Sequence, residues 1–150
     1  MIPVIVSRKL TATIGSDKAR NLAEEFALWL SGGIGPGDTF GKKSPFSAPK
    51  SVVGLLEKVH LESDDAIARW NGMIRQGITD SQAFTSDRVL VFGRAWDAPK
   101  APYILMTILE PGHEKMKDWS MLHEVGTEFS AEIRLFAREH PSDAWIYVGY

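Results

Sequence analysis

The segment that most constrains the fold runs from Tyr103 to Arg138. It begins with an apolar run, Tyr103 to Leu109, which is typical of a buried strand. A helical pattern follows, from near Asp118 or Ser120 to about Glu139. Its apolar stripe consists of Leu122, Val125, Phe129, Ile133 and Phe136. A buried strand followed by a long amphipathic helix predicts a sheet with that helix packed on one face.

The first third of the chain predicts a strand, a helix and a loop. Residues 2–10 are rich in β-branched side chains and favour a strand. Ser16 is a candidate N-cap for a helix that continues to Leu30 and stops at the following glycine pair. Residues 31–49 are rich in Gly, Ser and Pro, which indicates a loop. We expect Phe40 and Phe46 to pin this loop to the core, with the neighbouring lysines solvated.

The rest of the chain predicts further strands around one more helix. Residues 52–61 fit a helix that runs into a strand, and residues 58–61 alternate as a strand does. Residues 66–76 predict a helix closed by Gly77, and residues 78–86 a loop. Residues 88–92 and 103–109 predict a hairpin, and residues 144–148 could add an edge strand. This order indicates one α+β domain over residues 1–150 with a largely antiparallel sheet.

Composition restricts the class of protein. The 150 residues include no cysteine, which excludes disulfides and thiolate metal sites and fits a reducing compartment. The N-terminus lacks a signal-peptide pattern and no segment is apolar enough to span a membrane, so a cytoplasmic location is expected. The net charge of −2 is unlike that of a freestanding nucleic-acid binder. Any RNA would meet a local basic patch, or be held in place by another body.

The residues after the apolar run carry the candidate chemistry. Two of the four histidines, His113 and His123, fall within ten residues of each other, with Lys115 and Lys117 between them. RNA can be cut without a metal when its own 2′-hydroxyl attacks the phosphate. Histidine suits the two proton transfers, and lysine or arginine can stabilise charge on the phosphorane. His113 and Lys117 are four residues apart and would share one face of a helix.

Geometry sets a condition on this pair of histidines. One continuous helix would turn His123 well off the His113 face, so both converge only if the chain breaks near residues 118–120. The plainer interpretations are that His113 is only solvated, that His123 is half-buried, and that His60 on a predicted strand points outward. A His113/His123 zinc pair lacks any recognised spacing, so neither a metal nor another cofactor is expected.

The sequence resembles the YafO toxins of bacterial type II toxin–antitoxin systems, which are relatives of the RelE-like mRNA interferases. The resemblance covers about residues 2–137, and its most specific part runs from Ile108 through His123 to Phe136. The residues that carry it are Asn21 to Phe26, Phe40-Gly41, Lys58 to Leu61, Ser86 to Phe92, Ile108 to His113, Met121 to Gly126 and Phe129 to Phe136.

The resemblance implies a compact RelE-like α+β fold with a curved antiparallel sheet and helices packed on it. It implies an endoribonuclease that cleaves mRNA on the translating ribosome, inhibits translation and is neutralised by a cognate antitoxin. By position, His113, Lys117 and His123 fall where the family has a histidine, a basic residue and a histidine. Residues 139–150 look like a C-terminal extension.

Ribosome dependence would reconcile RNA cleavage with the acidic net charge. If the ribosome holds the mRNA, a few local contacts suffice. The candidates for these contacts are Lys42, Lys43, Arg88, Arg94 and Lys115. The alternative is a catalytically inactive toxin-like protein that acts as a ribosome- or partner-binding module, since five tryptophans would serve an interface equally well.

Overall fold

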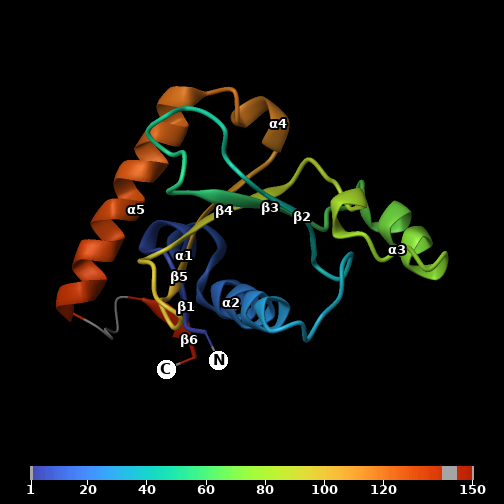
Figure 1. The fold of residues 1–150 in the computed structure, drawn as a ribbon, viewed down its shortest axis with the longest axis horizontal. Coiled ribbons are helices and arrows are strands. Elements are labelled where there is room, and N and C mark those ends of the chain that lie inside the picture. Colours follow the sequence, from blue (N-terminus) through green and yellow to red (C-terminus); the bar gives the residue numbers. More distant parts are fainter. Residues whose placement is uncertain (1, 140–144, 150) are drawn as a thin grey trace.

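The computed structural model describes residues 2–139 and 145–149, and these form an α+β fold around one curved, open sheet (Figure 1). The strands are β1 (Val4–Val6), β2 (Phe40–Pro45), β3 (Glu57–Leu61), β4 (Val89–Arg94), β5 (Tyr103–Leu109) and β6 (Ile146–Val148). The helices are α1 (Arg8–Ile14), α2 (Ser16–Leu30), α3 (Ile67–Arg75), α4 (Gly112–Lys115) and α5 (Trp119–Glu139), with a 3₁₀ turn, η1, at Ser81–Ala83.

The sheet is mixed, in the order β2-β3-β4-β5-β1-β6. From β2 to β5, each strand pairs antiparallel with the next strand along the chain. This confirms the predicted hairpin between β4 and β5. Strand β1 pairs with β5 in parallel, so the sheet is antiparallel everywhere but at this pairing in the described chain. The predicted edge strand at the C-terminus is confirmed, because β6 pairs antiparallel with β1.

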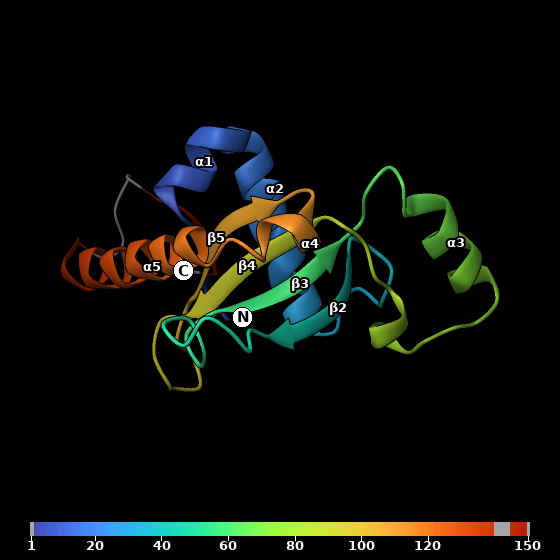
Figure 2. The ribbon, with the colours of Figure 1, turned by 90° about the horizontal axis from the view of Figure 1, so that it is seen from above.

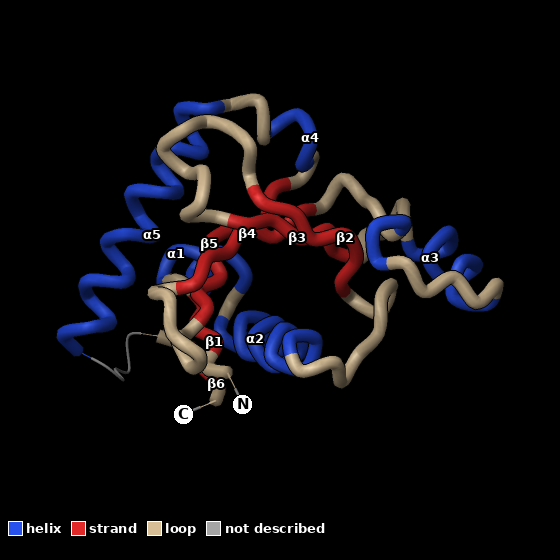
Figure 3. Tube along the Cα trace, viewed as in Figure 1, coloured by secondary structure: helices blue, strands red, loops and turns tan. Residues whose placement is uncertain are grey.

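Helices cover both faces of the sheet, and side-chain alternation explains which residues meet which helix. Figure 3 shows the sheet curving around α2, with α4 and α5 on the outer side. Leu90 and Phe92 of β4 pack with Phe26 of α2, whereas Val91 between them packs with Phe129 of α5. Because successive side chains of a strand point to opposite faces, each strand contributes to both cores.

The prediction of a strand over residues 2–10 was wrong beyond Val6. The Ser7 hydroxyl accepts the Leu10 backbone N–H at 3.1 Å and caps α1, so the chain turns into a helix at once. The next helix begins at Ser16 itself, and Gly15, at φ 91°, is its N-cap residue instead of Ser16.

The predicted loop over residues 31–49 contains β2. Its sequence, Phe-Gly-Lys-Lys-Ser-Pro, has no β-branched residue, and the strand forms because it pairs with β3. Gly41 allows the chain to approach Phe84 closely, since a Cβ there would lie 2.2 Å from the Phe84 carbonyl oxygen. Phe40 and Phe46 are buried, as expected. Residues 50–55 form turns before β3 begins, not a helix.

Two predicted features are confirmed: the helix closed by Gly77 and the chain break before the last long helix. Helix α3 ends before Gly77, whose φ is 78°, and it projects from one end of the sheet (Figure 2). The break between α4 and α5 lies where it was expected, and the Asp118 carboxylate accepts the Met121 N–H at 3.1 Å. None of the helices in the described chain combines the length and the apolar character that crossing a membrane requires.

Candidate functional site

Asp87 fixes His113 at the start of α4. One Asp87 carboxylate oxygen lies 2.7 Å from Nδ1 of His113 and accepts the His113 backbone N–H at 2.8 Å. The Gly112 N–H donates to the Asp87 carbonyl oxygen at 2.6 Å. Gly112 also lies tight against β4, since a Cβ there would be 2.8 Å from Val89 Cγ2. The His113 ring is therefore oriented through Nδ1, which leaves Nε2 directed away from Asp87.

His60, on β3, is held by the residue next to Asp87. Its Nδ1 lies 2.7 Å from the Ser86 carbonyl oxygen and 2.8 Å from the Ser86 backbone nitrogen. A ring nitrogen has a single in-plane position for a hydrogen bond. Nδ1 therefore either donates to the Ser86 carbonyl oxygen or accepts from the Ser86 backbone N–H. His60 is only 5% exposed, and the interpretation that it points outward was wrong. Its ring centroid is 6.0 Å from that of His113.

Two lysines extend this pair along the sheet. Lys58 lies two residues before His60 on β3 and shares its face, which is the face of α4 and α5 because Lys58 pairs with Val91. Its ammonium lies 4.7 Å from the centre of the Phe46 ring. Lys42, on β2, is half-buried. We call Lys42, Lys58, His60, Asp87 and His113 the histidine site.

Burial, hydrogen bonds and neighbouring positive charges shift the pKa values in the histidine site. Burial lowers the pKa of Lys58, and the charge of Lys42 lowers it further. Burial also lowers the pKa of His60, with smaller lowering effects from His113, Lys42 and Lys58, while the Ser86 hydrogen bond opposes the shift. The pKa of Asp87 is lowered by the hydrogen bonds from the backbone and ring of His113. An anion such as a phosphate would relieve this repulsion.

In the histidine site Asp87 and His113 are exposed, Lys42 and Lys58 are half-buried, and His60 lies beneath them. Figure 2 shows β2 and β3 uncovered on the side where α4 packs. A cavity of about 670 Å³ adjoins the site, and His113, Asp87 and Ser86 line it together with Arg69 of α3. Arg69 donates to the Thr85 carbonyl oxygen, as does the Trp70 indole at 3.0 Å. Helix α3 is thereby tied to the loop that holds both histidines.

The other predicted catalytic residues lie on α5 and the turn before it. Lys117 is exposed in that turn. His123 is also exposed, so the half-buried interpretation was wrong. Its backbone carbonyl accepts the Thr127 hydroxyl at 3.2 Å. Within the described residues, Lys42 and His113 both act electrostatically on His60, and the structure records no interaction of His113 with Lys117 or His123.

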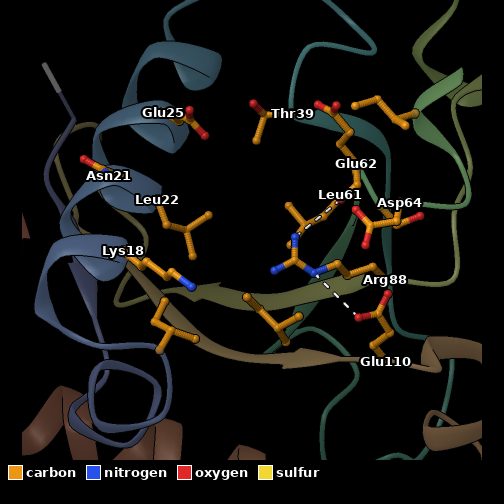
Figure 4. Close-up of a pocket in the computed structure, with 14 residues that line it drawn as sticks. Lys18, Asn21, Leu22, Glu25, Thr39, Leu61, Glu62, Asp64, Arg88 and Glu110 are labelled. Atoms are coloured by element: carbon orange, nitrogen blue, oxygen red, sulfur yellow. Dashed lines mark hydrogen bonds and ion pairs between the residues drawn. The ribbon is translucent and has the colours of Figure 1, made fainter. Parts of the chain in front are cut away.

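Arg88 enters a second cavity, of about 590 Å³, between α2 and the sheet (Figure 4). Its guanidinium lies 4.0 Å from the Glu110 carboxylate and donates to the Glu62 carbonyl oxygen at 3.4 Å. Lys18 reaches in from α2, and Glu25 and Asp64 also line the walls. We call this the Arg88 cavity.

The three remaining predicted RNA contacts lie outside both sites. Lys43 pairs with Glu57 at 3.5 Å, and Arg94 donates to the Ala98 carbonyl oxygen at 2.5 Å. Lys115 lines a further cavity of about 630 Å³ between α4, α5 and β5.

Asp87 and Lys58 were not predicted as site residues, and no role was predicted for His60. The available signal was the alternation of Lys58, Val59 and His60, which puts the two polar residues on one face of a strand. No group of three or more His, Asp or Glu side chains within residues 2–139 and 145–149 is arranged to hold a metal ion.

Comparison with protein families gives one match. Residues 21–132 match the family model described as "Toxin YafO, type II toxin-antitoxin system". The matched segment includes the whole histidine site. No curated protein sequence and no solved structure matches the chain.

Proposed function

This chain belongs to the YafO family of toxins of type II toxin–antitoxin systems, and we propose that it is an endoribonuclease. In this proposal it cleaves mRNA on the translating ribosome, in the cytoplasm, and a cognate antitoxin neutralises it. The observation that carries the proposal is the His113 ring, oriented by Asp87, with Lys42 close enough to the adjacent His60 to act on it electrostatically. These are the groups that metal-independent cleavage of RNA requires.

His113 is the primary proton-transfer residue in this proposal. The 2′-oxygen of the RNA attacks the adjacent phosphorus while the bond from phosphorus to the 5′-oxygen breaks. One group removes the 2′-proton and another protonates the 5′-oxygen, which leaves a cyclic phosphate and a 5′-hydroxyl. Asp87 supports this role of His113, because it accepts from Nδ1 and leaves Nε2 to exchange the proton. The reaction needs no cofactor.

Lys117 and His123 complete the proposed catalytic group. Lys117 stabilises charge on the scissile phosphate, and His123 is the partner or positioner of His113. Both side chains are exposed near the start of α5, so they can reach a substrate that lies across α4. Since neither interacts with His113 in the free protein, bound RNA would have to bring the three together.

The mRNA contacts are proposed for Lys42, Lys43, Arg88, Arg94 and Lys115. Lys42 is best placed, because it lies in the histidine site. The net charge of −2 supports the dependence on the ribosome, which would hold the message in place of an extended basic surface. A gel shift on free RNA is expected to give weak binding with a shallow salt slope. Tight binding with a steep slope would contradict ribosome dependence.

The direct test adds purified protein to a translation reaction and maps the new mRNA ends. Cleavage at ribosome-occupied codons is expected for the wild type and not for His113→Ala. Intact message with the wild type would overturn the nuclease assignment, and undiminished cutting by His113→Ala would overturn the role of His113.

A binding module without nuclease activity is the second candidate, and exposed tryptophans favour it. Trp119 is 58% exposed and Trp96 is 44% exposed, as at many interfaces. Induction of the protein alone separates the two: growth arrest with cleaved message supports the nuclease, and normal growth supports the binder.

A further inference from the structure

We propose that His60 is the second proton-transfer residue of this toxin and works as a pair with His113. The inference rests on the proposed nuclease function and adds a residue to it. It assigns to His60 the proton exchange that the 2′-hydroxyl requires, with His113 serving the 5′-oxygen.

The first argument is that one dipeptide orients both rings in the same way. Ser86 engages Nδ1 of His60, and Asp87 engages Nδ1 of His113. In each ring Nε2 is then the nitrogen left for another partner. The ring centroids are 6.0 Å apart, so the two rings lie close enough for both to act on one phosphodiester.

The second argument is electrostatic. The groups that face His60 are Lys58 on the same strand, Lys42 on β2, His113 on α4 and the Ser86-Asp87 loop. Burial and three cationic neighbours favour a neutral His60 ring, which is the form that accepts a proton. The Asp87 carboxylate gives His113 a counter-ion when its ring holds two protons. The surroundings therefore distinguish the two histidines as base and acid.

The proton balance closes within the pair. When Nδ1 of His60 donates to the Ser86 carbonyl oxygen, Nε2 carries a lone pair and takes the 2′-proton. The 2′-oxygen bonds to phosphorus and the bond to the 5′-oxygen breaks. The 5′-oxygen then takes the Nε2 proton of His113. Lys42 and Lys58 lie beside the phosphate position and offset the added negative charge.

A structural role for His60 would rest on Nδ1 alone, as an anchor for the Ser86-Asp87 loop. The variant His60→Asn tests this directly, because the Asn amide lies near the position of Nδ1 and has no equivalent of Nε2. His60→Gln is the complementary variant, since its amide reaches the position of Nε2 but cannot exchange a proton near neutral pH. His140→Gln makes the same chemical change at a histidine outside the proposed machinery.

The experiment measures single-turnover cleavage of mRNA on programmed ribosomes between about pH 5.5 and 8.5, across the range in which histidine titrates. The wild-type rate is expected to rise with pH through a limb centred below 6.5, the ordinary His pKa, because the pKa of His60 is lowered. His60→Asn should lose about 100-fold or more in rate, together with this limb. His140→Gln should match the wild type in both rate and pH profile. His123→Gln should keep the acidic limb of the profile, whether or not its rate falls.

The outcomes separate this inference from the proposed function. If the wild type does not cut ribosome-bound message, the nuclease proposal fails. If the wild type cuts and His113→Ala does not, but His60→Asn keeps both the rate and the acidic limb, only the role of His60 is overturned. Thermal unfolding checks that each variant folds. If His60→Asn does not fold, the pH–rate profile of His60→Gln decides. Loss of the acidic limb in this variant supports proton transfer by His60, and an acidic limb like that of the wild type refutes it.

Discussion

Asp87 and Arg88 are neighbours in the chain, but their side chains enter two sites of different electrostatic character. Asp87 meets His113 on the face of α4, where Lys42 and Lys58 supply positive charge around a buried His60. Arg88 enters the cavity beside α2, where carboxylates from Glu25, Asp64 and Glu110 share the walls with it. In the histidine site the positive groups repel one another, whereas in the Arg88 cavity the carboxylates offset the positive charge.

The difference shows how an acidic chain can still present a basic site. A net charge of −2 is a sum over the whole chain, whereas the pKa of His60 responds to the charges of its neighbours His113, Lys42 and Lys58. Strand alternation separates the two sites by sending neighbouring side chains to opposite faces. The histidine site is therefore the side on which we expect chemistry, and Lys18, on the α2 wall of the Arg88 cavity, serves as an internal control.

The largest expected effect is the loss of cleavage in His113→Ala. Removal of a general acid or base typically lowers the rate by about 10²- to 10⁴-fold, and we expect a loss in this range. Lys18→Ala removes a cation from the Arg88 cavity and should cut message like the wild type. Quantitative mapping of mRNA ends in a translation reaction measures both. A large loss in Lys18→Ala would break the contrast between the two sites.

Gly112→Ala is expected to have the next largest effect. The added Cβ would lie 2.8 Å from Val89 Cγ2 and 3.1 Å from the Asp87 carbonyl oxygen, so α4 must move away from β4. Overpacking of this kind costs about 1–3 kcal/mol of stability. The shift should also weaken the contact between His113 and Asp87. Urea denaturation and message cleavage measure the two consequences.

The control for Gly112→Ala is Gly35→Ala, because a Cβ at Gly35 has no atom within 4 Å. This variant should unfold at the wild-type urea concentration and cut normally. If Gly112→Ala behaved the same way, α4 would not be held as tightly against β4 as the contacts indicate.

Local patterns predicted the elements that frame the histidine site. Each of these elements is encoded by a local pattern: the apolar run of β5, the apolar stripe of α5 and the capping residue Asp118. Strand β2 was not predicted, because its lysines and glycine have little strand propensity and pairing with β3 imposes its conformation. Helix α1 was missed because one cap, Ser7, interrupts a β-branched stretch.

The site itself was only partly predictable. His113 stands out by its position after Pro111 and Gly112, where the strand ends. Its neighbourhood depends on long-range pairing, since the β3–β4 register brings His60 opposite Val89 and so beside Ser86 and Asp87. No local spacing encodes that register. Sequence proximity instead favoured His123, which lies on a separate helix.

A smaller effect is expected on the titration of His60. Because the charges of Lys42 and Lys58 lower the pKa of His60, Lys42→Gln and Lys58→Gln should each raise it toward 6.5. Lys18→Gln, on the opposite face, should leave it unchanged. The C2 proton of the ring reports this pKa in NMR spectra recorded across the titration. Equal responses to the Lys18 and Lys58 changes would mean that His60 senses overall charge instead of its own site.

The smallest expected effect concerns acid stability at Asp87. Its pKa in the folded protein lies below the ordinary value of 3.8, because the backbone and ring of His113 hydrogen-bond to the ionised carboxylate. A lowered carboxyl pKa stabilises the fold above the unfolded-state pKa, and this contribution disappears as pH falls through the folded-state value. Asp87→Asn should therefore lower the urea midpoint slightly at neutral pH and approach the wild type below about pH 3.8. Asp97→Asn, at an exposed carboxylate in the β4–β5 turn, is the matched control. If the urea midpoint of Asp87→Asn stayed below that of the wild type at low pH, packing and not the ionised carboxylate would hold the loop in place. The orientation of His113 would then need another cause.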